Sequence, residues 1–282
     1  MKRVSPLFYV DRNGQTASPP TIYEEEMNMD SKPLRIAAAA DLHCTKSGKG
    51  HFHPLFAEAS QAADVLLLCG DLTDYGLPEE AHVLAEEIRS FATIPILAVL
   101  GNHDYESGQT AELTRILTEA GVQMLDGECC EIRGVGFAGV CGFGGGFGRR
   151  MLNPWGEPLI KSFVQEAIDH GVKLERALGR IETAQRVVLL HYAPIRETVV
   201  GEDPEIFPFL GSTRLEGPLN RFNVQLAFHG HAHNGQPEAK TSAGVPVFNV
   251  SLPILKRVQP ERPWFRLVEI QPGTVTETAR AA

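Results

Sequence analysis

Short apolar runs recur along this chain and are separated by segments with helical periodicity. Five of the runs show little alternation between apolar and polar positions: 34–40 (LRIAAAA), 65–69 (VLLLC), 94–100 (IPILAVL), 186–190 (RVVLL) and 224–228 (VQLAF). Continuous apolar runs of this length are typical of strands that are buried on both faces of an α/β sheet. The pattern therefore predicts a buried sheet with helices on its outside.

The segments between these runs complete the picture. Apolar residues fall on one face of 79–92 and of 110–121, and the longer segment at about 159–184 is also predicted to be helical. The glycine-rich stretch 131–148 is typical of a strand followed by a flexible loop. Beyond residue 243, the remaining apolar stretches indicate strands with turns. We expect a sheet sandwich with helices outside, in a single α/β domain.

The length of 282 residues, 43% of them hydrophobic, allows one sizeable core, although two smaller domains are also possible on length alone. We expect the domain to occupy residues 31–272, with a flexible extension at 1–30 and a tail at 273–282. The N-terminus has no apolar signal-peptide core, and no stretch approaches the ~20 apolar residues of a membrane span. These features predict a cytoplasmic protein that does not cross a membrane.

Charge and cysteine content count against nucleic-acid-binding proteins and disulfide-stabilised proteins. The chain has 26 basic and 35 acidic residues, a net charge of −9, which disfavours a broad nucleic-acid interface that would need clustered Lys and Arg. The five cysteines are odd in number, and none has CxxC spacing. A disulfide framework is therefore not expected, and a reducing compartment fits the sequence better. The sequence does not indicate an oligomeric state.

Each apolar run is followed by polar residues of a narrow kind. The chemistry-bearing residues that follow the five runs, in order, are Asp41 and His43, then Asp71, then Asn102, His103 and Asp104, then His191, and finally His231 and His233. Because ligand sites in α/β sheets form at the carboxyl ends of strands, we expect the five groups to converge. Taken singly, each residue has an ordinary structural explanation, such as a helix cap or a buried histidine. Together they favour a shared site.

The spacing of these residues indicates metal binding. In extended backbone, residues two apart point the same way, so Asp41 can act with His43, and His231 with His233. Carboxylate and imidazole ligands without thiolate favour Mn, Fe or Zn. The donors exceed the needs of one ion, and two ions about 3.5–4 Å apart would use them all if Asp71 bridged both. A glycine before three of the groups would let the backbone pack closely there: Gly70, Gly101 and Gly230.

The five groups resemble the signature of the calcineurin-like metallophosphoesterase superfamily. The motifs stand in the family's order as DLH (41–43), GD (70–71), GNHD (101–104), the lone His191 and GHAH (230–233). The resemblance spans about 31–272 and is specific, because a single DxH would be a weak signal. It implies a four-layer α/β/β/α sandwich.

The resemblance also implies a role for each residue. One metal ion would be held by Asp41, His43 and His233, the other by Asn102, His191 and His231, and Asp71 would bridge the two. His103 would face the substrate as a catalytic residue, with Asp104 fixing its orientation and tautomer. His229 is not a ligand in the family motif, so we interpret it as a hydrogen-bonded supporting histidine.

Two departures from related motifs narrow the choice among the branches of this superfamily. Protein Ser/Thr phosphatases carry GDxxDRG, whereas Tyr75 stands here in place of the arginine. Purple acid phosphatases have a tyrosine ligand where this chain has Asp74. The pattern is most similar to bacterial class III cyclic-nucleotide phosphodiesterase-like proteins. Arg149 and Arg150 follow the glycine-rich loop, which we interpret either as a solvated basic pair or as substrate-binding arginines on a lid.

The function implied is hydrolysis of phosphodiesters or small phosphate esters, by attack of a metal-bridged hydroxide on phosphorus, with two divalent or trivalent ions (Mn, Fe or Zn) as cofactors. Alternatives are a phosphomonoesterase, a nuclease of the same superfamily, and a non-catalytic metal-binding scaffold. The negative charge counts against the nuclease. The retromer scaffold subunit resembles the family but lacks the histidine of the GNH motif, so the presence of His103 favours an enzyme.

Overall fold

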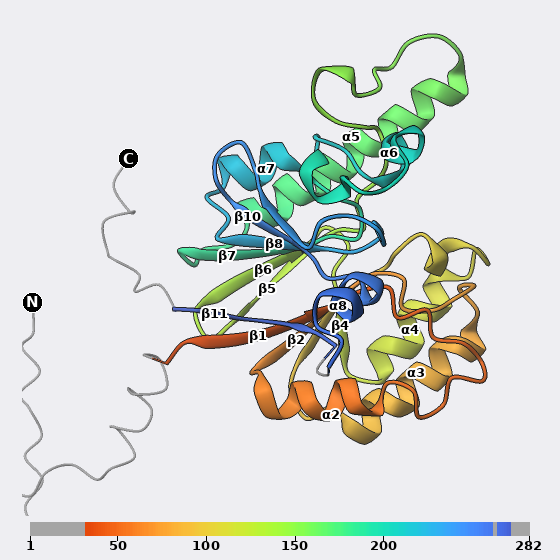
Figure 1. Cartoon of the computed structure of the whole chain (residues 1–282), viewed down its shortest axis with the longest axis vertical. Coiled ribbons are helices and arrows are strands. Elements are labelled where there is room, and N and C mark those ends of the chain that lie inside the picture. Colours follow the sequence, from red (N-terminus) through yellow and green to blue (C-terminus); the bar gives the residue numbers. More distant parts are fainter. Residues whose placement is uncertain (1–31, 262–263, 272–282) are drawn as a thin grey trace, which may run out of the picture.

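Two β-sheets lie face to face in the computed structural model, which describes residues 32–261 and 264–271 (Figure 1). The first sheet has the strand order β11 (Arg266–Ile270), β1 (Leu34–Ala39), β2 (Val65–Cys69), β3 (Ile96–Val99) and β4 (Val122–Met124). The second has the order β5 (Glu128–Ile132), β6 (Val135–Gly139), β7 (Gln185–Leu189), β8 (Leu226–His229), β10 (Pro246–Asn249) and β9 (Glu238–Lys240). The central strands of each sheet are parallel.

Helices cover the outer face of each sheet (Figure 1). The first sheet is flanked by α2 (His53–Ala62), α3 (Pro78–Phe91) and α4 (Thr110–Glu119), and the second by α5 (Pro158–Gly179) and α7 (Glu216–Arg221). Two shorter helices, α6 (Phe207–Leu210) and α8 (Leu252–Val258), complete the described part of the chain with the 3₁₀ turns η1 (His103–Tyr105), η2 (Gly148–Arg150), η3 (Arg196–Val199) and η4 (Pro204–Ile206). The predicted α/β class and the layered sandwich are confirmed.

The buried runs serve both faces of their sheets. Along β7, Val187 and Leu189 belong to the core between the two sheets, whereas Val188 packs in a second core with Leu174 of α5. This alternation follows from the period of two in a strand, and both sets are apolar because both faces are covered. The large ring of Phe137 on β6 lies in the core between the sheets. Continuous apolar runs were therefore a sound sign of these strands.

The glycine-rich segment contains the predicted strand, β6. This strand forms a hairpin with β5 that turns at Arg133 and Gly134, both with positive φ (47° and 75°), as two-residue hairpin turns require. The loop that follows, expected to be flexible, is tied down by backbone hydrogen bonds. The amide of Gly145 donates to Pro208 (2.6 Å) and that of Gly146 to Gly211 (2.9 Å). Residues that are distant in the sequence therefore hold this loop in place.

Two further predictions are revised, and a third concerns residues that the structure does not describe. The apolar run after β10, expected to be a strand, instead forms α8, whose start carries a proline that has no amide to leave unpaired. Helix α5 ends at Gly179 and not near 184, because the chain turns there to bury Ile181. The proposed extension at 1–30 and tail at 273–282 lie outside the described residues. Within the described residues, none of the helices is both long and apolar enough to cross a membrane.

Candidate metal centre

The carboxyl ends of five parallel strands, β1 and β2 with β3 from one sheet and β7 and β8 from the other, meet at one edge of the sandwich. Each predicted polar group follows one of these strands directly, so the fold gathers them at that edge. The donor atoms form three overlapping groups, each within 4.8 Å: Asp41, His43 and His233; His43, Asp71 and His103; and Asp71, His191 and His231.

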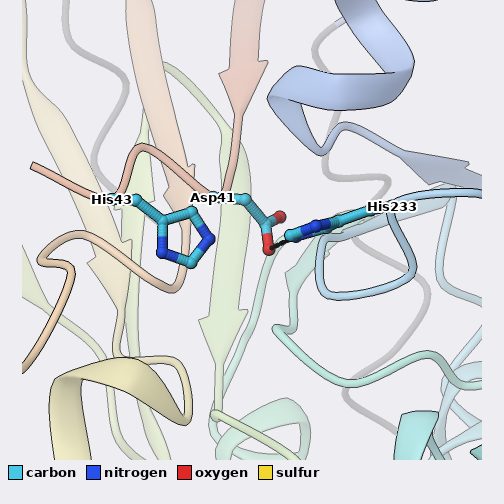
Figure 2. A group of neighbouring side chains, drawn as sticks. All are labelled: Asp41, His43 and His233. Carbon is cyan, nitrogen blue, oxygen red and sulfur yellow. Dashed lines mark hydrogen bonds and ion pairs between the residues drawn. The ribbon is translucent and has the colours of Figure 1, made fainter.

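The first group joins the two sheets. Asp41 follows β1, and His233 follows β8, yet Nε2 of His233 lies 2.8 Å from Oδ1 of Asp41 (Figure 2). The ring of His43 lies beside this pair, as Figure 2 shows, and it makes an edge contact with the ring of His233 at 5.7 Å. These three side chains therefore present an oxygen and two imidazole rings to a common point.

Asp71 lies between His43 and His191. Its Oδ1 is 3.4 Å from Nε2 of His191, and its Oδ2 is 3.8 Å from Nε2 of His43. The carboxylate thus turns one oxygen toward each half of the cluster. The ring of His231 lies 4.9 Å from that of His191, measured between centroids. This is the arrangement that a bridging carboxylate needs.

Asn102 belongs to the same half of the cluster as His191. Its Oδ1 lies 2.9 Å from Nε2 of His191. The other ring nitrogen, Nδ1, donates to the backbone carbonyl of Cys69 at 3.0 Å. Because that carbonyl can only accept, it fixes the tautomer and directs Nε2 toward Asn102 and Asp71.

The backbone is strained at this cluster. Asp41, His43, Asp71 and His231 all have positive φ, at 58°, 47°, 50° and 68°. Non-glycine residues rarely adopt this conformation, which costs of order 1–3 kcal/mol at each position and is concentrated at functional sites. Surrounding contacts hold these residues in place, including the amide of His231, which donates to the carboxylate of Asp41 at 3.0 Å.

The three glycines allow the close approach that the sequence predicted. A Cβ at Gly70 would collide with the ring of His191, and one at Gly101 would collide with the carboxylate of Asp71. A Cβ at Gly230 would meet the carboxylate of Asp41. Only glycine leaves room there for the site side chains.

The donor set fits a metal centre. Both ring nitrogens of His43 are buried, and neither makes a hydrogen bond with another described residue. Buried polar atoms normally have hydrogen-bond partners. A buried imidazole without such partners, beside two carboxylates, has the environment of a metal ligand. The residues offer oxygen and imidazole nitrogen without thiolate, which suits borderline ions such as Mn, Fe or Zn.

The electrostatics of the cluster are those of a cation site. Burial alone would raise the pKa of Asp41, but the hydrogen bond from His233 and the nearby imidazoles outweigh it and lower the pKa to about 2. Burial lowers the pKa of His231 to about 3, with a further contribution from His191. An ionised carboxylate and a neutral imidazole are the forms that bind metal.

His103 lies at the edge of the cluster, with its ring centroid 4.5 Å from that of His43. Its backbone amide donates to Oδ1 of Asp71 at 2.9 Å. Burial alone would lower its pKa, but the hydrogen bond to the carbonyl of Asp74 and the charge of Asp71 outweigh it and raise the pKa. The ring is half-buried, and so it remains reachable from solvent.

The partner of the His103 ring is not the expected one. We expected Asp104 to orient the ring, but the ring's Nδ1 donates to the backbone carbonyl of Asp74 at 2.6 Å. Asp104 is fully buried, and its carboxylate accepts from the amides of Gly101 (2.8 Å) and Thr73 (2.8 Å) and from the Thr73 hydroxyl (2.6 Å). Asp104 thus joins the loops after β2 and β3 and acts on His103 only through the backbone.

Other singled-out residues fall outside the cluster. His229 is buried, with Nδ1 donating to the carbonyl of Gly230 and Nε2 2.8 Å from the Thr198 hydroxyl, which matches its interpretation as a supporting histidine. His53, at the start of α2, stacks on Phe91 with their ring centroids 3.7 Å apart. Thr198, which reaches His229 from the distant turn η3, carries no signal in the sequence that could have identified it.

Arg149 and Arg150 are exposed on η2, directly after the glycine-rich loop. The amide of Gly148, which begins this turn, donates to the Thr213 hydroxyl at 2.8 Å. The turn is thus attached to the segment before α7. Substrate binding by the two arginines stays a prediction.

Comparison with known proteins places these motifs in context. The profile of the family described as Calcineurin-like phosphoesterase matches residues 34–235, which include all five motif groups. An uncharacterized protein of Methanocaldococcus jannaschii is 25% identical over 210 residues, covering 73% of this chain and 83% of that protein. The structure of the phosphopantetheinyl hydrolase of Mycobacterium tuberculosis is similar in fold, with a TM-score of 0.61 and 17% identity over 85% of this chain and 96% of that chain.

Proposed function

This chain belongs to the calcineurin-like phosphoesterase family, whose members are metal-dependent phosphoester hydrolases, and we propose that it hydrolyses phosphodiesters or small phosphate esters with two metal ions. The observation that carries the proposal is the position of Asp71. Its two carboxylate oxygens face His191 and His43, which belong to different halves of the cluster. A single carboxylate shared in this way is what a dinuclear centre requires.

In this proposal, the ligands divide between the two ions as the motifs imply. Asp41, His43 and His233 would hold the first ion, Asn102, His191 and His231 would hold the second, and Asp71 would be shared by both. When bound, the two ions would activate a water molecule for attack on phosphorus and neutralise the charge on the phosphate oxygens. The glycines and the positive-φ residues hold the proposed ligands close together.

His103 handles the proton in this scheme. Its Nδ1–H is committed to the carbonyl of Asp74, so Nε2 is the nitrogen that remains for substrate. A proton on Nε2 can pass to the oxygen of the departing alcohol as the bond to phosphorus breaks. The amide link from His103 to Asp71 fixes the ring's position relative to the ligands.

We favour diesters because of the resemblance to class III cyclic-nucleotide phosphodiesterases and because Tyr75 replaces the arginine of the protein phosphatases. A diester carries less negative charge than a monoester dianion and so needs less positive surface. The nuclease alternative is disfavoured by the net charge of −9. The scaffold alternative is disfavoured by the retention of His103 beside an intact donor set.

The test is metal analysis joined to a substrate panel. Wild-type protein would be stripped, reloaded with Mn²⁺, Fe²⁺ or Zn²⁺, and assayed against phosphate monoesters and diesters, including a phosphopantetheinyl diester and a DNA oligonucleotide. His233→Asn is expected to lose metal and activity, whereas His82→Asn, the same change at an exposed histidine outside the cluster, retains both. Absence of hydrolysis of every ester by metal-loaded wild-type protein would refute the proposal.

A further inference from the structure

A cavity of about 500 Å³ lies at the same edge of the sandwich as the metal centre. Its walls come from the segment after β3, from α4, and from the ends of β4 and β6, which supply Leu100, Tyr105, Thr114, Leu125 and Cys141 among the lining residues. Because these strands are parallel, their carboxyl ends stand beside those that carry the metal-site residues.

Two walls of the cavity are formed by residues that are linked through the backbone to residues of the site. Tyr105 ends the turn η1 that begins with His103, so the two side chains come from one rigid turn. On the opposite wall, the carbonyl of Cys141 accepts the backbone amide of His191 at 2.8 Å. The walls of the cavity are thus linked through the backbone to His103 on one side and to a proposed ligand on the other.

The lining of the cavity is apolar with a few hydroxyl groups. Leu100 and Leu125 form apolar wall, and Tyr105 and Thr114 contribute hydroxyls. No hydrogen bond joins the Tyr105 hydroxyl to another described residue, so this group is available to a ligand. No lysine or arginine is among the lining residues within the described chain. The cavity therefore suits an organic group without a second phosphate.

The two acidic lining residues do not change this preference. Asp126 and Glu128 lie at the exposed rim. Asp126 is paired with Lys173 at 3.1 Å, and Glu128 with Arg180 at 2.9 Å. These pairs balance the charge of the rim.

We infer that this cavity binds the leaving alcohol of the ester, an uncharged apolar group of the size of an aromatic ring system, with Tyr105 and Thr114 as specificity-determining residues. The inference rests on the proposed function, because it assigns the cavity to the departing group. The assignment follows from the position of the cavity, since Tyr105 in its wall stands two residues after His103, which would protonate the leaving group. Esters of polyphosphates and other multiply charged alcohols are excluded by the same lining.

The experiment fills the cavity from α4. Thr114→Trp places a large side chain in the cavity, and Thr118→Trp places the same side chain one helical turn away, at an exposed position that does not line it. Ala111→Trp, at an exposed position on the cavity's rim, serves as a second filling variant if Thr114→Trp unfolds. Circular dichroism melts identify the folded variants.

Two methyl phosphodiesters report on the cavity, one with a 4-methylumbelliferyl leaving group and one with a trifluoroethyl leaving group. Each rate is compared with that of wild-type protein on the same ester, so the acidity of the leaving alcohol cancels. Filling the cavity is expected to lower kcat/KM at least about 10-fold for the large leaving group and less than about 2-fold for the small one. Thr118→Trp is expected to change neither. Equal loss on both esters would overturn the inference.

A binding measurement separates this inference from the proposed function. Equilibrium dialysis of 4-methylumbelliferone needs no catalysis, and its Kd is expected to rise at least about fivefold in the filled variant and to stay unchanged in Thr118→Trp. If wild-type protein hydrolyses no ester, the proposed function fails. Dialysis then still shows whether the cavity binds the alcohol. Unaltered binding of the alcohol in both filled variants would overturn the cavity assignment while leaving hydrolysis in place.

Discussion

Nδ1 of His103 donates a hydrogen bond to the backbone carbonyl oxygen of Asp74 at 2.6 Å. A carbonyl oxygen cannot donate, so Nδ1 carries a proton, which leaves Nε2 for other partners. The orienting group is backbone and is therefore retained whatever side chain occupies position 74. In the proposed function this bond holds His103 for proton transfer. His103 shares a donor group with His43 and Asp71 but not with His231 or His233.

Replacement of His103 by alanine should separate catalysis from metal binding. The variant is expected to keep the metal content of the wild-type protein and to lose turnover by roughly 10²–10⁴-fold, the range for a positioned acid or base. Metal content would be measured by inductively coupled plasma mass spectrometry, and kcat with a chromogenic diester. A variant that loses its metal would place His103 among the ligands instead.

Asp71 should be needed for both ions. Asp71→Asn keeps the size of the side chain but removes the charge that two cations would share, so metal content and hydrolysis are both expected to fall to near background. Asp169→Asn on the exposed face of α5 is the matched control and should behave as wild type. Full metal stoichiometry and rate in Asp71→Asn would show that this carboxylate does not bridge.

Glycine at position 101 should be required by close packing. In Gly101→Ala, the new Cβ meets the backbone amide and carboxylate of Asp71, so the loops must move. Overpacking of this kind costs roughly 1–3 kcal/mol in the free energy of unfolding, and the shift should also weaken metal binding. Urea unfolding and metal titration would measure the two effects.

The control for that substitution is Gly217, in α7, where an added Cβ meets nothing within 4 Å. Gly217→Ala is expected to leave metal binding unchanged, because α7 lies outside the cluster. If Gly101→Ala bound metal as tightly as wild type, the close approach of residue 101 to Asp71 would not be needed for metal binding.

The sequence predicted best what local pattern determines. The five buried strands and the polar groups after them could be read directly, because a strand covered on both faces is apolar throughout and its carboxyl end carries the site. The hairpin turn at Arg133 and the order of the loop containing Gly145 could not, since the latter depends on Pro208, far away in the chain. The family resemblance supplied the ligand assignment, which the spacing alone left open.

Asp104 shows a second limit of sequence reasoning. A carboxylate next to a histidine that is proposed to be catalytic suggests a direct pair, yet the ring of His103 bonds to the carbonyl of Asp74. Asp104 instead satisfies the amides of Leu72 and Thr73 at the end of another strand. Adjacent residues in a tight turn point in different directions, and only the three-dimensional structure shows which amides need an acceptor.

His229 should make stability depend on pH. Burial lowers its pKa from 6.5 to about 4, so the folded protein holds it neutral while the unfolded chain binds a proton below pH 6.5. The free energy of unfolding should therefore fall as the pH drops from 6.5 toward 4, by about 3 kcal/mol in total from this group. Above pH 6.5 the group contributes no slope.

The measurement compares wild type with His229→Gln by urea unfolding between pH 7.5 and 4.5, with EDTA present so that metal binding does not contribute. The glutamine variant, which cannot titrate, should show a shallower decline in stability. His82→Gln, at an exposed position, should follow the wild-type curve. Parallel curves for wild type and His229→Gln would show that His229 is not held neutral by burial.

The last prediction concerns the choice between diesters and monoesters. Tyr75, 55% exposed, stands where the protein phosphatases have an arginine, and none of the motif groups contains an arginine. A monoester dianion therefore gains less from this site than a diester with one negative charge, whose second organic group also gains contacts. With Mn²⁺ supplied, bis-p-nitrophenyl phosphate should be cleaved with a higher kcat/KM than p-nitrophenyl phosphate, once each rate is divided by its uncatalysed rate in the same buffer. Tyr75→Arg should shift that ratio toward the monoester, because a guanidinium suits a dianionic phosphate. A monoester preference in wild-type protein after this correction would overturn the diesterase assignment and leave the metal centre unaffected.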